Sequence, residues 1–123
     1  MKLDIELCRI ILQKIENESD INGLQIFPHI NGYNDDFVFY QIKKMKEAGY
    51  IDYDIYGKSN KYEYFTTEIT YYGHEFLRQM LDDTIWTKTK DLAKSSGMSL
   101  TFETVKAIIP IAIQYLLKSI KGE

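Results

Sequence analysis

His74 and Glu75 are the residues that come closest to a catalytic motif in this sequence. Helical zinc proteases carry His-Glu-x-x-His, in which two histidines four residues apart bind the metal and the glutamate acts as a general base. Here Arg78 stands four residues after His74, so the second metal ligand is missing. We therefore expect His74 to pack, or to act as a cap near Gly73, at the junction between the hairpin and the next helix.

The other reactive side chains have structural explanations. Cys8 lies on an apolar helical stripe, where a cysteine behaves as a small hydrophobic residue. His29 is a lone loop residue, and the carboxylates of Asp82 and Asp83 are explained by capping of a helix. The sequence contains no glycine-rich phosphate loop. We expect no catalytic residues, no metal site and no cofactor, and hence a protein that is not an enzyme.

Lysines and tyrosines are the side chains through which we expect the chain to bind a partner. Lysine contacts phosphate groups, and tyrosine beside lysine either stacks on bases or anchors a protein interface. The predicted binding residues are Tyr40, Lys43, Lys44, Lys46, Tyr56, Lys58, Lys61, Tyr62 and Tyr64. Two structural alternatives stay open: a solvated lysine face on a helix, and cross-strand tyrosine packing that stabilises an exposed hairpin.

Two amphipathic helices are expected to position the first of these residues. Over residues 4–16, apolar side chains recur at three- and four-residue steps. Their stripe is Ile5, Cys8, Ile11, Leu12 and Ile15. The apolar residues 24–27 before Pro28 predict a short strand or an extended connection. The second helix is expected to begin after its N-cap Asn34 and to end at Gly49. Its core stripe is Val38, Ile42, Met45 and Ala48.

A change to a two-residue repeat after Gly49 predicts a β-hairpin. The inner face of its first strand carries Ile51, Tyr53 and Ile55. A polar loop over residues 57–61 leads to a second strand over residues 62–69, whose inner face carries Phe65, Thr67 and Ile69. The tyrosines expected to point outward are Tyr56, Tyr62 and Tyr64.

Helical spacing returns after the hairpin. Thr70 is a plausible N-cap for residues 71–94, which form one bent helix or two, and Asp82 and Asp83 can cap the second. The apolar side of the first part is Tyr72, Phe76, Leu77, Met80 and Leu81. A last helix starts near Thr101, and Pro110 in its middle is expected to kink it.

The last helix is apolar around most of its circumference between residues 107 and 117. This run is well short of the roughly 20 residues that span a bilayer. We expect it to form a homodimer seam, with burial in the chain's own core or a hydrophobic docking surface as alternatives. The predicted dimer residues are Val105, Ile109, Ile113, Leu116 and Leu117.

The composition is that of one compact domain. The chain has 123 residues, of which 45% are hydrophobic and 27% are charged. Its net charge of −3 excludes a strongly basic nucleic-acid binder. Because there is a single cysteine and no signal-peptide pattern, we expect a cytoplasmic protein. We divide the domain into a core over residues 1–70 and a C-terminal helical extension over residues 71–123.

The order of helix, glycine and hairpin is the local pattern of a winged helix. The chain reads Lys44-Met45-Lys46-Glu47-Ala48-Gly49-Tyr50-Ile51, in which small Ala48 is expected to let the helix end lie close to the sheet. The sequence therefore predicts an α+β fold: a winged-helix-like domain with additional C-terminal helices.

Four stretches also carry a resemblance to a known family. They are residues 1–12, the turn at residues 30–33, the helix end at residues 46–49, and residues 69–77 running on to Asp82-Asp83-Thr84-Ile85-Trp86. Over nearly its whole length the chain resembles the family called domain of unknown function 2513, which consists of small bacterial and phage proteins. The resemblance implies a winged-helix-like fold and brings no functional residues with it.

Two features bear on DNA binding. Residues 17–33 hold a strand-like piece and turns where a helix-turn-helix would have a second helix. Residues 34–61 carry five positive and five negative groups, and Asp35 and Asp36 open the presumptive recognition helix. The segment that would contact DNA is therefore neutral overall, although phosphate contacts need local Lys or Arg.

Two functions remain in competition. The leading hypothesis is a small, non-enzymatic DNA-binding or regulatory protein of bacterial or phage origin that forms a homodimer. The rival is a protein-binding inhibitor or adaptor, such as a phage protein that blocks a host nucleic-acid-binding defence protein. Neither hypothesis includes a membrane or a small-molecule substrate.

Overall fold

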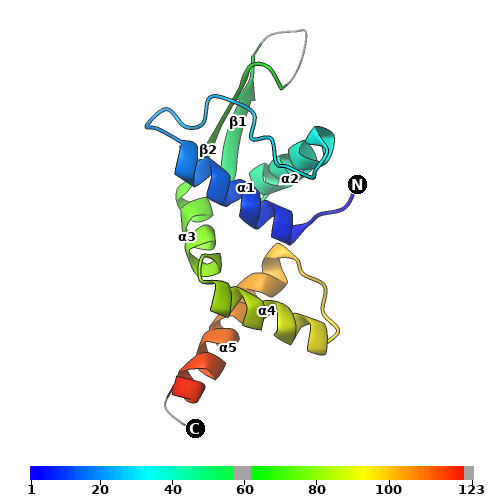
Figure 1. Ribbon diagram of the computed structural model, residues 1–123, viewed down its shortest axis with the longest axis vertical. Coiled ribbons are helices and arrows are strands. Elements are labelled where there is room, and N and C mark those ends of the chain that lie inside the picture. The colour runs from blue at the N-terminus through cyan, green and yellow to red at the C-terminus, as the bar shows by residue number, and fades with distance from the viewer. Residues whose placement is uncertain (57–61, 121–123) are drawn as a thin grey trace. The chain divides into compact units, whose positions relative to one another are not determined.

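The computed structural model describes residues 1–56 and 62–120 of the chain and has the predicted α+β character (Figure 1). The elements are α1 (Ile5–Glu18), α2 (Asp35–Glu47), β1 (Ile51–Ile55), β2 (Phe65–Ile69), α3 (Tyr71–Met80), α4 (Asp83–Ser95) and α5 (Phe102–Ile120). They form two compact units, Met1–Leu77 and Arg78–Glu123, so the boundary falls inside α3. The sequence predicts the start of the helical extension at residue 71.

The first two helices begin at the predicted caps. The carboxylate of Asp4 accepts a hydrogen bond from the backbone N–H of Leu7 at 3.0 Å, and the predicted α1 stripe is buried. The amide oxygen of Asn34 accepts from the N–H of Asp36 at 2.8 Å, and α2 ends before Gly49, whose φ is +84°. Both side-chain caps bind N–H groups that have no partner inside the helix.

The predicted role of Ala48 is wrong. Val38, Ile42 and Met45 are buried as expected, but Ala48 is exposed at the helix end. The close approach is made instead by Gly73 in α3, where an added Cβ would lie 1.9 Å from the carbonyl oxygen of Tyr50. The prediction of a close contact at this junction is right, but the small residue that makes it lies in α3 and not at the end of α2.

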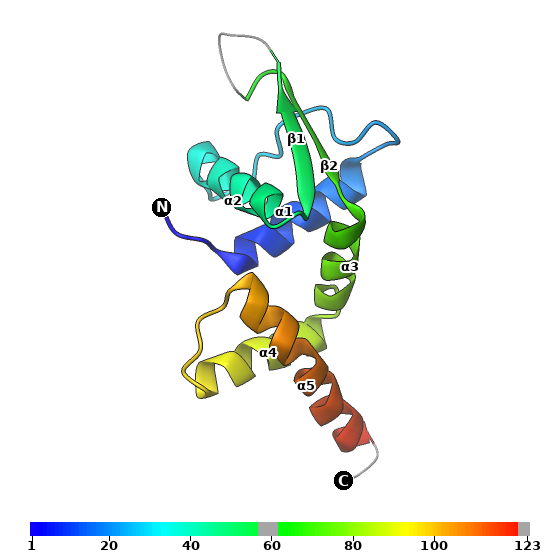
Figure 2. The ribbon, with the colours of Figure 1, turned by 180° about the vertical axis from the view of Figure 1, so that it is seen from behind.

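The predicted hairpin is confirmed (Figure 2). β1 and β2 pair antiparallel from Ile51 opposite Ile69 to Ile55 opposite Phe65. The whole predicted inner face of β2 is buried. The second strand begins at residue 65 rather than 62, and the predicted loop over residues 57–61 lies outside the described residues.

The extended connection before α2 is also confirmed, as a single bridge rather than a full strand. The N–H of Leu24 donates to the carbonyl oxygen of Thr67 at 2.8 Å, and the N–H of Thr67 donates back at 2.9 Å. Residues 19–34 contain no helix, so the second helix of a helix-turn-helix is missing, as the sequence indicated.

Two separate helices follow the hairpin. The hydroxyl of Thr70 accepts from the N–H of Gly73 at 3.0 Å at the start of α3, and Asp82 caps α4 by accepting from the N–H of Ile85 at 2.9 Å. The α3 prediction is partly wrong, because Tyr72 is exposed. Leu81, also expected on the apolar side, is exposed and follows the helix end.

Two of the predicted dimer residues on helix α5 were assigned to the wrong surface. Val105 and Ile109 are buried within the single chain, so they belong to the core. Ile113 and Leu116 are half-buried, and Leu117 is exposed. Of the helices in the described parts of the chain, none is long and apolar enough to cross a membrane.

Candidate binding surface on helix α2 and the hairpin

Helix α2 is fixed to the N-terminal segment by a buried glutamine. The side chain of Gln41 accepts from the N–H of Asp4 at 2.8 Å and donates to the carbonyl oxygens of Lys2 at 3.0 Å and Phe37 at 3.3 Å. A buried amide must make such bonds, because an unsatisfied polar group costs about 1–3 kcal/mol. Sequence analysis missed Gln41, although its position three residues after Val38 and four before Met45 puts it on the buried stripe.

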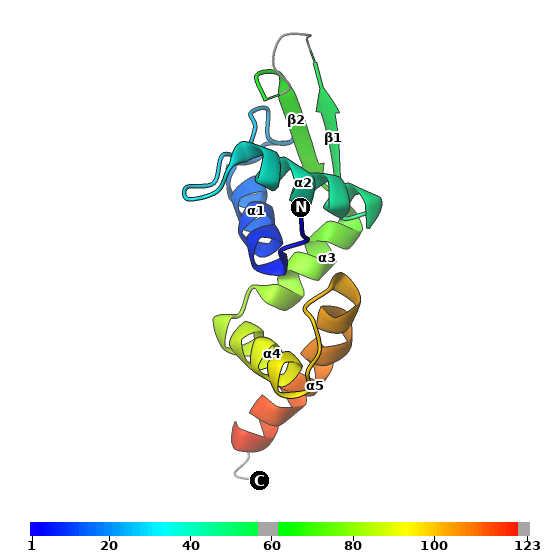
Figure 3. The same ribbon diagram turned by 90° about the vertical axis from the view of Figure 1, so that its right-hand side faces the viewer.

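An aromatic cluster joins the hairpin to α2 and to the loop before it. The Phe27 ring lies 4.5 Å from that of Tyr62 and 5.1 Å from that of Phe65. The Tyr53 ring lies 5.5 Å from Phe39 of α2 and 5.6 Å from Phe65. Edge and offset contacts of this kind favour burial of the rings, so the hairpin is held against α2. Figure 3 shows the two strands rising side by side from the level of α2.

The prediction that Tyr62 points outward is therefore wrong. Its ring is half-buried against Phe27 and Phe39, and its hydroxyl donates a hydrogen bond to the carboxylate of Asp36 in the first turn of α2. Tyr62 thus positions the hairpin relative to the helix.

Tyr56 and Tyr64 point outward as predicted. They are 54% and 52% exposed, and the N–H of Tyr56 donates to the carbonyl oxygen of Tyr64 at 2.7 Å. This bond extends the strand pairing by one step and places the two tyrosines together. The predicted Lys58 and Lys61 lie outside the described residues.

Lys44 and Lys46 of α2 each lie beside a carboxylate of the same chain. The ammonium group of Lys44 donates to the Glu47 carboxylate at 3.1 Å and lies 5.3 Å from the centre of the Tyr40 ring. This hydrogen bond and the charge of Glu47 raise the pKa of Lys44. The same helix carries Lys43, whose side chain is exposed.

Lys46 connects the end of α2 to β1. Its ammonium group lies 3.3 Å from the carboxylate of Asp52, 3.4 Å from the carbonyl oxygen of Tyr53, and 4.7 Å from the centre of the Tyr53 ring. Exposed ion pairs contribute little to stability, but each places a negative charge next to the positive one.

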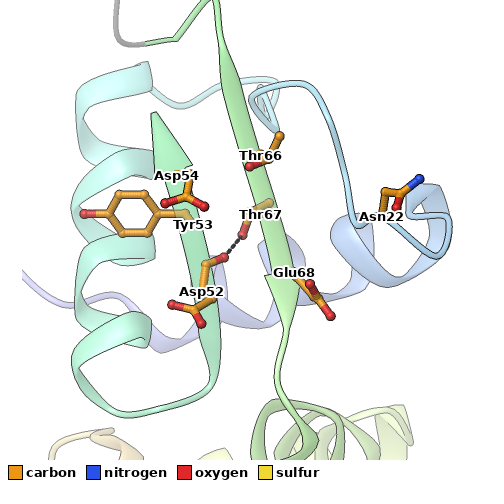
Figure 4. Close-up of a pocket in the computed structure, with 7 residues that line it drawn as sticks. All are labelled: Asn22, Asp52, Tyr53, Asp54, Thr66, Thr67 and Glu68. Carbon is orange, nitrogen blue, oxygen red and sulfur yellow. Dashed lines mark hydrogen bonds between the residues drawn. The ribbon is translucent and has the colours of Figure 1, made fainter. Parts of the chain in front are cut away.

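The outer face of the hairpin is acidic (Figure 4). Asp52 and Asp54 of β1 and Glu68 of β2 line a groove of about 240 Å³ together with Asn22, Tyr53, Thr66 and Thr67. Asp52 stands directly opposite Glu68 in the strand register. Like charges in this position destabilise a sheet, and the ammonium group of Lys46 offsets the effect at Asp52.

The histidines and the cysteine have structural partners. His29 Nδ1 lies 2.8 Å from the Asp35 carboxylate, and His74 Nδ1 lies 3.3 Å from that of Glu16. Burial, followed by the nearby charge of Asp4, raises the pKa of the Cys8 thiol to about 12. A thiol with such a pKa is protonated at neutral pH and is a poor nucleophile.

Comparison with known proteins places the chain in a family. A protein of Haemophilus influenzae (strain Rd), described as an uncharacterized protein, is 29% identical over 117 residues, which cover 95% of this chain and 99% of the relative. No solved structure matches the chain. Residues 2–99 match the family described as Hypothetical protein (DUF2513). The chain therefore belongs to the DUF2513 family.

Proposed function

We propose that this chain is a non-enzymatic binding module and that its N-terminal unit, winged-helix-like in design, recognises a basic surface of another protein. The winged-helix assignment is supported by the order of α2, a left-handed glycine and the β1–β2 hairpin. Residues 19–34 depart from the winged-helix pattern, because they hold no helix.

The observation that carries the proposal is the pairing of exposed tyrosines with an acidic hairpin face. Tyr56 and Tyr64 offer rigid aromatic surface next to a strand pair that carries Asp52, Asp54 and Glu68. Tyrosine is enriched at the energetically dominant positions of protein interfaces. Carboxylates around such anchors favour partners with complementary positive charge and raise the rate of association.

The charge of the N-terminal unit favours a protein partner over nucleic acid. Residues 1–77 carry eight Lys and Arg residues against thirteen Asp and Glu residues, a net charge of −5. Phosphate binding would also have to compete with Glu47 for Lys44 and with Asp52 for Lys46. Because non-specific DNA affinity comes almost entirely from lysine and arginine contacts to phosphate, these neighbours weaken it.

Duplex DNA is the second candidate ligand, and one arrangement favours it. Tyr40, Lys43 and Lys44 occupy the outer side of the helix that directly precedes the hairpin, which is where winged-helix proteins present base-reading residues. In that case the first turn of α2, with Asp35 and Asp36, has to face away from the phosphates.

Fluorescence anisotropy with a labelled DNA duplex at low salt separates the two candidates, since phosphate contacts are strongest there. The protein-partner proposal expects no saturable binding. Binding that weakens steeply with added salt and is lost in Lys43→Glu would overturn it and support the DNA candidate.

Photo-cross-linking in cells of the native host tests the protein-partner proposal directly. A photoreactive phenylalanine analogue at Tyr64 should give a discrete adduct with a second protein, and Asp54→Lys should abolish that adduct. The same charge reversal at Asp91 in the other unit is the matched control and should leave the adduct intact. An adduct that survives Asp54→Lys and is lost with Asp91→Lys contradicts the proposed surface.

A further inference from the structure

We propose that a second copy of this chain docks in an apolar groove between the start of α4 and the end of α5, with the two α5 helices parallel. The groove has a volume of about 380 Å³. Its lining residues are Asp82, Thr84, Ile85, Ile113, Leu116, Leu117, Ser119 and Ile120. The groove lies wholly in the C-terminal unit, so the inference does not depend on the proposed function.

The apolar stripe of α5 is longer than the helix that covers it. α5 has 19 residues and α4 has 13, which correspond to about 28 Å and 20 Å of helix. The last turns of α5 extend past α4 in the ribbon (Figures 1 and 3). Val105 and Ile109 are buried, whereas Leu117 and Ile120 on the continuation of the stripe are 47% and 82% exposed.

The residue types along the exposed stripe favour a parallel pair. Ile113, Leu116 and Ile120 follow the three- and four-residue steps of coiled-coil positions a, d and a. Isoleucine at a with leucine at d favours a parallel two-stranded seam, in which each residue faces the same residue of the second copy. A two-fold axis parallel to the helices then brings opposite flanks of the two stripes together.

The acidic start of α4 agrees with this orientation. α4 lies on one flank of α5, where Lys88 is 5.0 Å from the Tyr115 ring, and its acidic start holds Asp82 and Asp83. At 100° per residue, Leu117 follows on the other flank, whereas Lys118, seven residues after Ile111, shares the opposite side of α5 with Ile111. Parallel pairing places the acidic start of α4 beside Leu117 of the second copy and keeps the two acidic starts apart. Antiparallel pairing brings the two acidic starts together.

The oligomeric state in solution tests the proposal. Light scattering should give a dimer. Leu117→Glu should raise the dissociation constant of the dimer about a hundredfold, because about tenfold in affinity is lost at each of the two symmetric sites. Ile111→Glu is the matched control, because Ile111 is also 47% exposed but lies on the opposite side of α5. It should leave the dimer intact, and circular dichroism should show that both variants are folded.

Disulfide cross-linking tests the orientation. In Ile120→Cys the two introduced thiols are neighbours in a parallel pair, within the Cα separation that a disulfide requires, and mild oxidation should give a covalent dimer. In the antiparallel pair they are too far apart. Ile111→Cys should stay monomeric under denaturing conditions, and the native Cys8 is buried.

The proposal is overturned by any of three results. A chain that is monomeric at all concentrations assigns the groove to a partner of different sequence. Equal effects of Leu117→Glu and Ile111→Glu place the dimer contact elsewhere. Failure of Ile120→Cys to cross-link in a proven dimer excludes the parallel arrangement.

Discussion

Gly73→Ala should destabilise the N-terminal unit, although alanine is the better helix former. Gly73 lies inside α3, where this substitution ordinarily stabilises a helix by about 1 kcal/mol. Here the added Cβ would lie 1.9 Å from the carbonyl oxygen of Tyr50 and 2.7 Å from Cγ2 of Ile69. α3 must therefore move away from the end of α2.

The size of the effect follows from three contributions. Overpacking of this kind costs about 1–3 kcal/mol. The movement also weakens the hydrogen bond from the N–H of Thr70 to the carbonyl oxygen of Tyr50, now 3.0 Å, which costs about 1 kcal/mol more. After subtraction of the gain in helix propensity, we expect a loss of about 2 kcal/mol.

Urea unfolding followed by circular dichroism measures this loss. Gly32→Ala provides the comparison, because Gly32 has a φ of +86° but nothing within 4 Å of an added Cβ. That variant should lose only the cost of a left-handed residue, about 1 kcal/mol. If Gly73→Ala is as stable as the unmodified chain, the close approach of α3 to Tyr50 is refuted.

Three further predictions concern buried groups and caps. Gln41→Leu should lower the free energy of unfolding by about 1–3 kcal/mol, because the N–H of Asp4 loses its acceptor, and amide exchange at Asp4 should accelerate. Asp82→Ala should cost about 1 kcal/mol by removing the α4 cap, as read from Trp86 fluorescence during unfolding; an unchanged midpoint would count against the cap. The folded-state pKa of Cys8 is raised from 9.0 to about 12. The contribution of the protonated thiol to folding stability is therefore complete below pH 9 and is lost as the pH rises toward 12. The stability difference between the unmodified chain and Cys8→Ala should therefore fall by up to about 1.4 kcal/mol per pH unit in that range, and a constant difference would contradict the shift.

Local patterns predicted the elements of this chain because their signals are local. The cap at Asn34, the left-handed Gly49 and the strand over residues 51–55 each depend on a few neighbouring residues, and all three are confirmed. The inner face predicted for that strand is wrong at its end, because Ile55 is exposed. The same holds for the cap at Asp82, which also settles that residues 71–95 form two helices.

The candidate surface was less predictable because it depends on contacts between distant residues. Tyr62 looked outward by alternation, but Phe27 and Phe39, which bury it, are 35 and 23 positions away in the sequence. The spacing of Gln41 places it on the buried stripe of α2, but its hydrogen-bond partners in the N-terminal segment lie nearly forty residues away and could not be predicted from the sequence.

The dimer residues illustrate a further limit. Periodicity identifies the apolar stripe of α5 but cannot say how much of it α4 covers, so Val105 and Ile109 were assigned to the wrong surface. The length of the neighbouring helix, which sequence analysis left open, decides where the covered part ends.

The bridge between Leu24 and Thr67 has a consequence for self-association. A two-stranded sheet ordinarily has two open edges, and strands of other chains can pair with either of them. Here Leu24 occupies the β2 edge. Gly23 fits beside it because it has no Cβ; an added Cβ would lie 2.5 Å from the carbonyl oxygen of Thr67. Growth along β1 would stack Asp52 and Asp54 on an incoming strand, so the fold itself opposes fibril formation from this hairpin.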